Sequence, residues 1–396
     1  MLTHQDLLSY FYDGIKKPDA CKMGLELEQF SFNKATGKPL PYDGDISVSA
    51  LLHKMIDDYG WQAYRENDII IALKRELSTG EMQNLSLEPG GQIELSGAVH
   101  STVSSVKQEA YEFCYELYKA GDALGIGFKA IGFTPEWTRD DFYTMPKQRY
   151  NIMKNYMPQV GTMGLDMMFR TCTVQLNMDY ISEADMVKKV RVALALQPLA
   201  TAYFANSSIK EGQDTGFKSY RSHIWTNTDK DRTGILPFMF NANAGFEVYM
   251  EYALAVPMYF VKRDGRYIDC AGQSFADFMQ GKLPALPNIY PTLSDWEDHL
   301  STIFPEVRLK NFIEMRGADA NPLEKSVMIT DFWSHLIYNP EILSVCTDII
   351  KNWDASQIQQ LRLDAARFGF DAKTPDNHTL SDVLKNLFTG TQIFQD

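Results

Sequence analysis

The sequence predicts an α+β fold with a largely antiparallel sheet. Strand-like segments such as 23–33 alternate with amphipathic helical segments such as 101–124, without the regular rhythm of βαβ units. The segment 169–180 has one polar and one apolar face, which is typical of antiparallel sheets with one face exposed. No GxxxxGK[ST] loop is present, and no GxGxxG loop follows a strand. The sequence therefore does not predict a phosphate-binding turn of the doubly wound folds.

Turn residues divide the first half of the chain into elements. Pro89-Gly90-Gly91 must form a turn or bulge, because proline breaks a strand ladder and glycine tolerates the backbone angles required. Gly125 closes a long helix. The remaining boundaries follow from hydrophobic spacing. We expect, in order, a helical lead-in over 1–20, a strand over 23–33, a helix over 48–59, strands over 69–74 and 86–96, and a helix over 101–124.

The second half starts with the strand that carries a polar face. Ser182-Glu-Ala-Asp185 then resembles a capping box and starts a helix, which Pro198 is expected to kink. The stretch that follows residue 321 is mostly helical by spacing. We expect a strand over 169–180, a helix from 182 to about 206, a helix over 246–255, short strands over 258–261 and 267–270, and helices from 322 onward.

Composition indicates an ordinary globular protein. Of its 396 residues, 45% are hydrophobic and 22% are charged, which suits a chain with a large core. The net charge of −13 argues against a general nucleic-acid or membrane-surface binder. It also means that an anionic substrate would need local positive charge. We expect one domain over 1–396, with 321–396 as its helical C-terminal part.

Several features predict a cytoplasmic protein. No apolar run approaches the length that spans a bilayer. The N-terminal residues have neither the basic and apolar regions of a signal peptide nor the Arg/Ser-rich character of a transit peptide. The five cysteines are widely spaced and contain no CxxC pair, which fits free thiols in a reducing compartment.

Five glutamates on strand-like segments are the strongest indication of chemistry. They are Glu26, Glu28, Glu88, Glu94 and Glu314. Residues two apart in a strand share a face, so the first two point the same way. Carboxylates gathered on one face repel unless a cation holds them. Mg²⁺ and Mn²⁺ prefer oxygen ligands and leave room for substrate phosphates. The pattern therefore suggests a metal–nucleotide site on a sheet.

Simpler interpretations of these residues remain open. Glu26 and Glu28 could form a solvated strand face, and Glu314 could pair with Arg316 in a surface salt bridge that contributes little. Repetition favours the site, since three separate strands place carboxylates amid apolar or glycine-rich surroundings.

Two arginines are candidates for gripping a substrate carboxylate through paired hydrogen bonds. Arg221 is the stronger candidate, although a loop salt bridge with Asp229 or Asp231 would explain it equally well. Arg170 is the weaker one, because strand alternation puts it on the apolar face. His223 is more typical of a packed histidine than of a catalytic base.

Long motifs in this sequence resemble glutamate–cysteine ligase, in its plant and proteobacterial branch. The similarity extends from about residue 20 to 320. The motifs that carry it are EPGGQIELSG (88–97), RYNIMKNYM (149–157), GLDMMFRTCTVQ (164–175), RSHIW (221–225), VPMYFV (256–261), FPEVRLK (304–310) and EMRGAD (314–319).

The resemblance implies a glutamine-synthetase-like fold, in which an antiparallel sheet forms a funnel for ATP and Mg²⁺, with Mn²⁺ as a substitute. It implies the first step of glutathione synthesis. ATP would phosphorylate the γ-carboxylate of L-glutamate, and the amine of L-cysteine would displace phosphate. No nucleic acid or membrane partner is implied, and we expect a monomer or homodimer.

The resemblance also implies residue roles. The metal ligands would be Glu26, Glu28, Glu88, Glu94 and Glu314, and Gln175 would add a metal or nucleotide contact. Arg316 would stabilise charge on the transferred phosphoryl group, which makes it, with Glu314, a catalytic candidate. Arg221 would hold the glutamate α-carboxylate, with Arg170 as the weaker alternative.

Two other functions stay open. A related ligase could join glutamate to a different amine, because apolar pockets discriminate poorly between similar side chains. A non-catalytic paralogue could bind nucleotide only. Loss of a predicted metal carboxylate would favour the paralogue, and none is lost.

Overall fold

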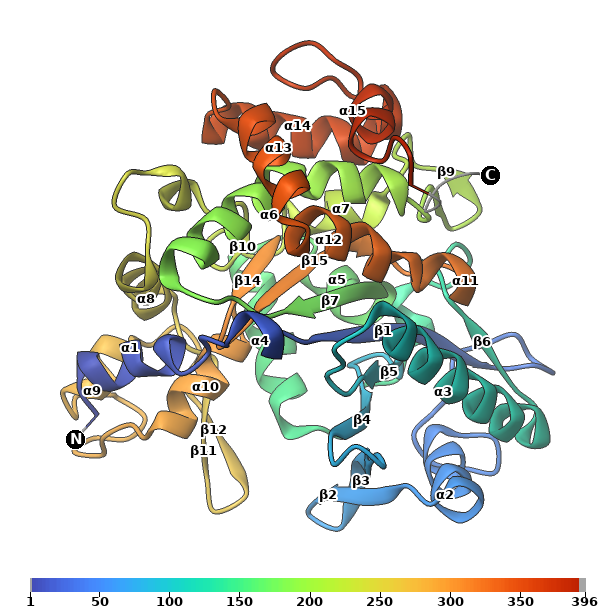
Figure 1. Ribbon diagram of the computed structural model, residues 1–396. Coiled ribbons are helices and arrows are strands. Elements are labelled where there is room, and N and C mark those ends of the chain that lie inside the picture. The colour runs from blue at the N-terminus through green and yellow to red at the C-terminus, as the bar shows by residue number, and fades with distance from the viewer. Residues whose placement is uncertain (1, 392–396) are drawn as a thin grey trace.

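A nine-stranded sheet crosses the middle of the protein, as a computed structural model shows for residues 2–391 (Figure 1). Every pairing within this sheet is antiparallel. Its strand order is β14-β15-β7-β1-β5-β4-β3-β2, and β6 also pairs with β1. The predicted α+β class with a largely antiparallel sheet is confirmed.

Besides the large sheet, the described residues form three separate two-stranded sheets. The strands are β1 (Met23–Asn33), β2 (Gln62–Glu66), β3 (Ile69–Glu76), β4 (Met82–Leu87), β5 (Ile93–Ser96), β6 (Ile126–Lys129), β7 (Thr173–Met178), β8 (Ile209–Lys210), β9 (Gln213–Asp214), β10 (Thr233–Gly234), β11 (Phe260–Arg263), β12 (Arg266–Asp269), β13 (Phe304–Pro305), β14 (Val307–Leu309) and β15 (Ile313–Asp319).

Helices surround the sheet, and those near the C-terminus gather together at the top of Figure 1. They are α1 (His4–Tyr12), α2 (Val48–Tyr59), α3 (Val103–Leu124), α4 (Gln148–Val160), α5 (Gly164–Arg170), α6 (Glu183–Tyr203), α7 (Tyr220–Trp225), α8 (Phe246–Ala255), α9 (Phe275–Met279), α10 (Leu293–Ser301), α11 (Leu323–Ser326), α12 (Met328–Tyr338), α13 (Pro340–Ile350), α14 (Ala355–Phe368) and α15 (Leu380–Leu387).

Alternation along the central strands separates a core face from a polar face. Leu25 and Leu27 of β1 are buried, as are Ile313 and Met315 of β15. Helices α3, α6 and α12 contact β1, β15 and β7. The glutamates of these strands alternate with the apolar residues and face the other way. The sheet therefore has a core side and a side available for chemistry.

Most expected elements are confirmed. Helices α2 and α8 begin and end where hydrophobic spacing predicts, and Ser182 caps α6 by accepting a hydrogen bond from the backbone N–H of Asp185. The helix ends at Tyr203 rather than near residue 206. The lead-in over 1–20 contains α1 and a 3₁₀ turn over Pro18–Ala20. The helical C-terminal part is confirmed through Leu387, and residues 392–396 lie outside the described part.

The expected strand over 169–180 is wrong at its start. Phe169 and Arg170 belong to α5, and β7 begins only at Thr173. Alternation therefore does not apply to Arg170. No helix within residues 2–391 combines the length and apolar character needed to cross a membrane. The single domain over 1–396 stays a prediction.

The turn between β4 and β5 places Glu88 at the polar face. The N–H of Gly91 donates to the carbonyl of Glu88 at 2.9 Å, and Gly91 has a φ of +83°, which favours glycine. A Cβ on Gly90 would lie 2.7 Å from the backbone oxygen of Phe169. The interruption predicted at Pro89-Gly90-Gly91 is confirmed, and Gly90 lets the turn approach α5 closely.

We expect Gly90→Ala to destabilise the protein by about 1–3 kcal/mol, because a backbone oxygen cannot yield to the added methyl group. Thermal unfolding followed by circular dichroism measures the effect. Gly24→Ala is the matched control, since its Cβ would lie 3.4 Å from the nearest atom, at ordinary contact distance. Equal unfolding temperatures for the two variants would contradict this explanation of the turn.

Candidate active site

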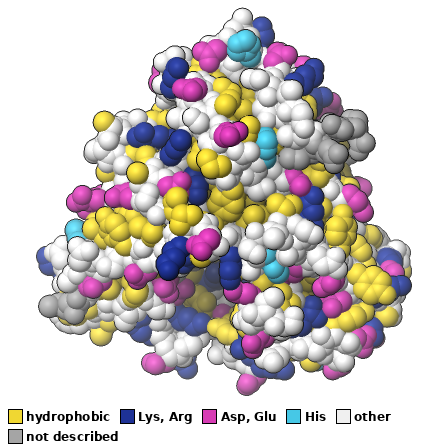
Figure 2. Space-filling view, in the orientation of Figure 1, with side chains coloured by type: hydrophobic (Ala, Val, Ile, Leu, Met, Phe, Trp, Pro, Cys, Tyr) yellow, Lys and Arg dark blue, Asp and Glu magenta, His cyan; other side chains and the backbone are white. Residues whose placement is uncertain are grey.

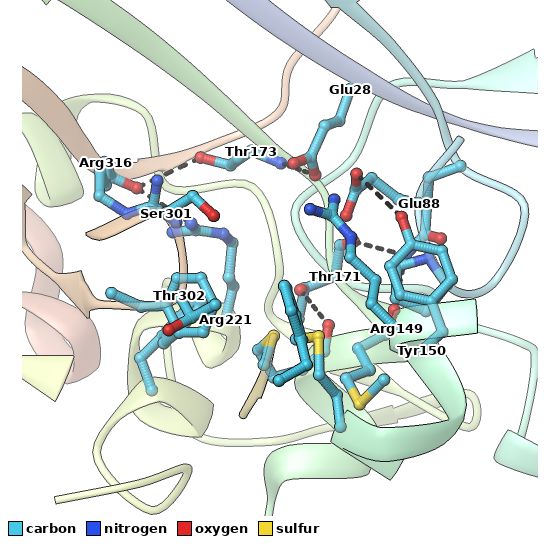
Figure 3. A pocket seen from close by; sticks show the side chains of 18 residues that line it. Glu28, Glu88, Arg149, Tyr150, Thr171, Thr173, Arg221, Ser301, Thr302 and Arg316 are labelled. Carbon is cyan, nitrogen blue, oxygen red and sulfur yellow. Dashed lines mark hydrogen bonds between the residues drawn. The ribbon is translucent and has the colours of Figure 1, made fainter. Parts of the chain in front are cut away.

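A cavity opens on the polar face of the sheet, between the central strands and helices α4, α5 and α7 (Figure 3). Segments far apart in the sequence converge on it, and both acidic and basic side chains point into it. Its lining residues are Glu28, Glu88, Pro89, Gln92, Arg149, Tyr150, Met153, Met167, Met168, Thr171, Thr173, Arg221, Trp225, Phe260, Ser301, Thr302, Phe304 and Arg316.

Positive charge is concentrated locally despite the net charge of −13. Arg149, Arg221 and Arg316 line the cavity. On the face shown in Figure 2, Lys and Arg side chains lie around a hollow in the lower half of the view, with Asp and Glu side chains beside them. The site therefore provides the local charge that an anionic substrate requires.

Two carboxylates oppose each other directly on the polar face. Glu28 of β1 is the register partner of Glu94 of β5, an arrangement in which like charges repel. The backbone N–H of Thr173 donates to Glu28 at 2.9 Å, and the hydroxyl of Ser96 donates to Glu94 at 2.5 Å. Burial, together with the neighbouring glutamates, raises the pKa of Glu28 well above its usual value and that of Glu94 to about 7. Protein cations do not compensate this pair fully.

Glu26 and Glu88 complete the acidic side. Glu26 is the register partner of Gln175 and accepts a hydrogen bond of 2.9 Å from the side-chain amide of Asn177. Burial, and then the charges of Glu314 and Glu94, raise its pKa to about 7. Glu88 lines the cavity from its turn, where the Tyr150 hydroxyl lies 3.4 Å from its carboxylate. The structure thus brings the predicted strand carboxylates to one face.

These side chains have the chemistry of a hard-cation site. A divalent ion bound by Glu28 and Glu94 would relieve their repulsion, and carboxylate oxygen is the donor such ions prefer. Within residues 2–391, no group of three or more His, Cys, Asp or Glu side chains is arranged as a ready-made metal site. The donor chemistry fits the predicted metal, whereas the complete ligand set stays a prediction.

Glu314 has a different environment from the other glutamates. It is fully buried, and Arg308 donates to both of its oxygens, at 2.7 and 3.0 Å. Arg316 also donates to it, and the Lys310 ammonium lies 3.4 Å away. Burial alone would raise its pKa, but these cations hold the pKa well below its usual range. A role as metal ligand would require one of them to release an oxygen, so the geometry favours the other glutamates as ligands.

Arg316 is held at the cavity by two acceptors. Besides Glu314, its guanidinium donates to the side-chain oxygen of Gln175 at 2.6 Å. Gln175 does not line the cavity, so in this structure it orients Arg316. The alternative of a surface salt bridge between Glu314 and Arg316 does not hold, because the pair is buried and forms part of a cluster with Arg308 and Lys310.

Arg221 lies on α7 and reaches across to β15. It is buried, with an exposed fraction of 3%, and its guanidinium donates to the backbone carbonyl of Arg316 at 2.9 Å. Its Nε has no hydrogen-bond partner in the described residues. The alternative salt bridge with Asp229 is not formed, since Asp229 pairs with Arg232 at 2.6 Å. Arg221 therefore keeps donor capacity for a ligand.

Arg170 does not belong to this site. Because it ends α5 rather than beginning a strand, its side chain is directed to Asp166 and Glu211, at 3.3 and 3.1 Å. It stacks over the ring of Phe133 and does not line the cavity. The geometry therefore favours Arg221 at this cavity, and the role of Arg170 as the weaker substrate-binding candidate stays a prediction, since its Nε and Nη2 also have no hydrogen-bond partner in the described residues.

Sequence reasoning assigned no role to several residues that complete the site. Arg149 and Tyr150 enter the cavity from α4, and Thr173 connects the two sides by bonding Glu28 through its N–H and the Arg316 carbonyl through its hydroxyl. The motif at 149–157 contains the first two, but helical spacing does not reveal which residues face a distant sheet. Arg308 was missed because its pairing depends on the register of β14 with β15.

Comparisons with known proteins agree with this geometry. The family model "Glutamate-cysteine ligase family 2 (GCS2)" matches residues 22–396. The chloroplastic glutamate–cysteine ligase of Brassica juncea is 48% identical over 97% of this chain and 74% of its own length. The enzyme of Medicago truncatula is 49% identical over 97% of this chain and 75% of its own length.

A solved structure supports the fold. The glutamate–cysteine ligase of Francisella tularensis, in complex with AMP, is 10% identical and covers 94% of this chain and 78% of its own, with a TM-score of 0.55. This confirms the predicted glutamate–cysteine ligase fold, of the glutamine-synthetase-like type.

The predicted cytoplasmic location is wrong. The curated relatives from Brassica juncea, Arabidopsis thaliana and Medicago truncatula are all named as chloroplastic enzymes, which contradicts that expectation. The predicted family, in contrast, is confirmed by the family model and by these relatives: the chain belongs to glutamate-cysteine ligase family 2.

Proposed function

We propose that the cavity is the place where this chain joins L-glutamate to L-cysteine with ATP, the first step of glutathione synthesis. The family and its curated relatives support the reaction as a whole. The observation that carries the assignment to this cavity is the arrangement of Glu28 and Glu88 opposite Arg221 and Arg316 (Figure 3). A phosphoryl donor and a dicarboxylic amino acid need charges of both signs at close range.

The reaction consists of two displacements. A γ-carboxylate oxygen of glutamate attacks the terminal phosphorus of ATP, and the bond to ADP breaks. The cysteine amine then attacks the γ-carbonyl carbon, phosphate leaves, and the amine loses a proton. Both steps develop negative charge on oxygen, so positioned cations contribute more than an acid–base residue. The cavity offers arginines for this purpose, and none of the described histidines lines it.

Arg316 is placed to stabilise the transferred phosphoryl group. Gln175 and Glu314 fix its guanidinium before substrate arrives, so little reorganisation is needed during the reaction. Glu26, Glu28, Glu88 and Glu94 would hold Mg²⁺ or Mn²⁺, with Glu314 less favoured. Such an ion, when bound, neutralises phosphate charge.

Arg221 is the residue for the glutamate α-carboxylate. Its Nε is unpartnered in the described residues although it is buried, and a carboxylate at the cavity would satisfy it. The apolar part of the wall, formed by Met153, Met168 and Phe260, suits a small thiol side chain on the acceptor. These features support cysteine over a charged amine.

Phosphate release by the purified protein with ATP, Mg²⁺ and L-glutamate tests the reaction. We expect strong stimulation by L-cysteine and a product with the mass of γ-glutamylcysteine. Other small amines serve as controls. Stimulation by a different amine alone would assign another acceptor, and no release under any condition would indicate a nucleotide-binding paralogue.

Arg221→Lys should raise the KM for L-glutamate on the order of tenfold, because lysine cannot donate two parallel hydrogen bonds to a carboxylate. The KM for ATP should change little. Arg170→Lys is the matched control: it alters an equally buried arginine that lies outside the cavity, so the KM for L-glutamate should stay near that of the unchanged protein. The reverse pattern would restore Arg170 as the glutamate-binding residue.

Glu314→Gln should lower kcat by about 100-fold, because Arg316 loses its charged anchor. It should also lower the unfolding temperature, since removing one partner leaves buried cations uncompensated, at a cost of about 3–5 kcal/mol. The Mg²⁺ concentration at half-maximal activity should stay nearly unchanged. A large rise in that concentration, with the unfolding temperature unchanged, would instead make Glu314 a metal ligand.

A further inference from the structure

Asp319, at the end of β15, is a buried carboxylate outside the cavity. Its exposed fraction is 1%, and no Lys or Arg of residues 2–391 forms an ion pair with it. A Cβ on Gly132 would lie 2.4 Å from its carboxyl carbon, so the chain packs tightly against it. Burying a carboxylate without an ion pair costs free energy, so hydrogen-bond donors must compensate the charge of Asp319.

Three donors from one segment converge on this carboxylate. The backbone N–H of Asn206 and the hydroxyl of Ser207 donate to one oxygen, at 2.8 and 2.6 Å. The hydroxyl of Ser219 donates to the other oxygen at 2.8 Å. Asp319 therefore fixes both ends of the loop that runs between α6 and α7, and hydrogen bonds to an ionised acceptor are stronger than neutral ones.

The same two serines hold the start of α7. The Ser207 hydroxyl accepts a hydrogen bond of 3.1 Å from the backbone N–H of Arg221. The Ser219 hydroxyl caps α7 by accepting from the N–H of Ser222 at 3.1 Å. One hydroxyl therefore separates the carboxylate of Asp319 from the backbone of Arg221.

The guanidinium of Arg221 is fixed from the same strand that carries Asp319. It donates to the carbonyl of Arg316, beside a shift in the β15–β7 register between Met315 and Ala318. Residues of β15 therefore hold both parts of Arg221: Asp319 holds its backbone through Ser207, and the Arg316 carbonyl holds its guanidinium. Burial lowers the pKa of Arg221, and the charge of Asp319 offsets part of this effect by favouring the charged guanidinium.

We propose that Asp319 is a positioning residue that sets the place of Arg221, and through it the affinity for L-glutamate. The inference rests on the proposed role of Arg221. Asp319 does not contact substrate in this scheme. It positions α7 through Ser207 and Ser219, and this short helix places the guanidinium of Arg221 at the cavity.

Asp319→Asn tests this with almost no change in shape. An asparagine has one oxygen acceptor, so its NH₂ group would face one of the donors that now bond the carboxylate. We expect the KM for L-glutamate to rise on the order of tenfold, with the KM for ATP near its original value. Glu109→Gln is the matched control. It also removes a buried carboxylate that accepts a backbone hydrogen bond, here from Ala98 at 2.8 Å, but away from Arg221.

A double-mutant cycle separates positioning from general stability. In the Arg221→Lys background, Asp319→Asn should add little to the KM for L-glutamate, because both changes remove the same interaction. Full additivity of the two effects would overturn the inference. If Arg221→Lys alone leaves this KM unchanged, the proposed role of Arg221 fails first, which is distinguishable from a failure of Asp319 alone.

Ser207→Ala keeps the inference testable should Asp319→Asn not fold. It removes the hydroxyl that joins the carboxylate to Arg221 and leaves the cap of α7 intact. The KM for L-glutamate should rise several-fold, with an unfolding temperature close to that of the Glu109→Gln control. An unchanged KM in this folded variant would contradict the connection.

Discussion

Negative charge gathered on one face of an antiparallel sheet is the constraint on which the rest of this structure depends. Strand alternation places the glutamates together, in positions that are buried at Glu314 and partly buried at the others, so their charge must be balanced at short range. Glu314 is balanced by Arg308, Arg316 and Lys310. Glu28 and Glu94 are not, and their raised pKa values record the difference. The charge of Glu314 is thus balanced within the protein, whereas the charges of Glu28 and Glu94 would be balanced by a bound cation.

The apolar face of the same sheet offsets the destabilising repulsion between these carboxylates. The alternate residues of the same strands are apolar and pack against α3, α6 and α12, in a core that includes residues from Leu7 to Phe388. A sheet with a dry face of this extent can tolerate repulsion on its other face, since burial of each large apolar side chain contributes about 1.5–3 kcal/mol. The apolar and the acidic residues that alternate along these strands therefore depend on each other. Packing of the apolar residues fixes the strands, and the strands fix the positions of the carboxylates.

Period-two alternation is the reason that much of the site could be predicted from the sequence. It correctly put Glu26 and Glu28 on one face and paired Glu314 with Arg316. It failed at Arg170, because the local chain there is helical and alternation has no meaning in a helix. Arg308 and Asp319 act through strand register and loop packing, and Arg149 enters the cavity from a helix. The contacts of Asp319 and Arg149 join residues far apart in the sequence. A single sequence contains no local signal for such contacts, whereas long motifs reveal only that a segment belongs to the family.

Local geometry, rather than the field of the whole molecule, must capture the substrates. Glutamate and ATP are anions, and a chain with a net charge of −13 does not attract them from a distance. Screening also limits attraction between exposed charges to about 8 Å at physiological salt. Affinity therefore depends on where a few guanidinium groups are held inside the cavity. An arginine that is displaced by even a small distance loses paired hydrogen bonds and gains nothing from the surrounding field. The groups that hold these arginines therefore matter to recognition as well, as Gln175 does by accepting a hydrogen bond of 2.6 Å from Arg316.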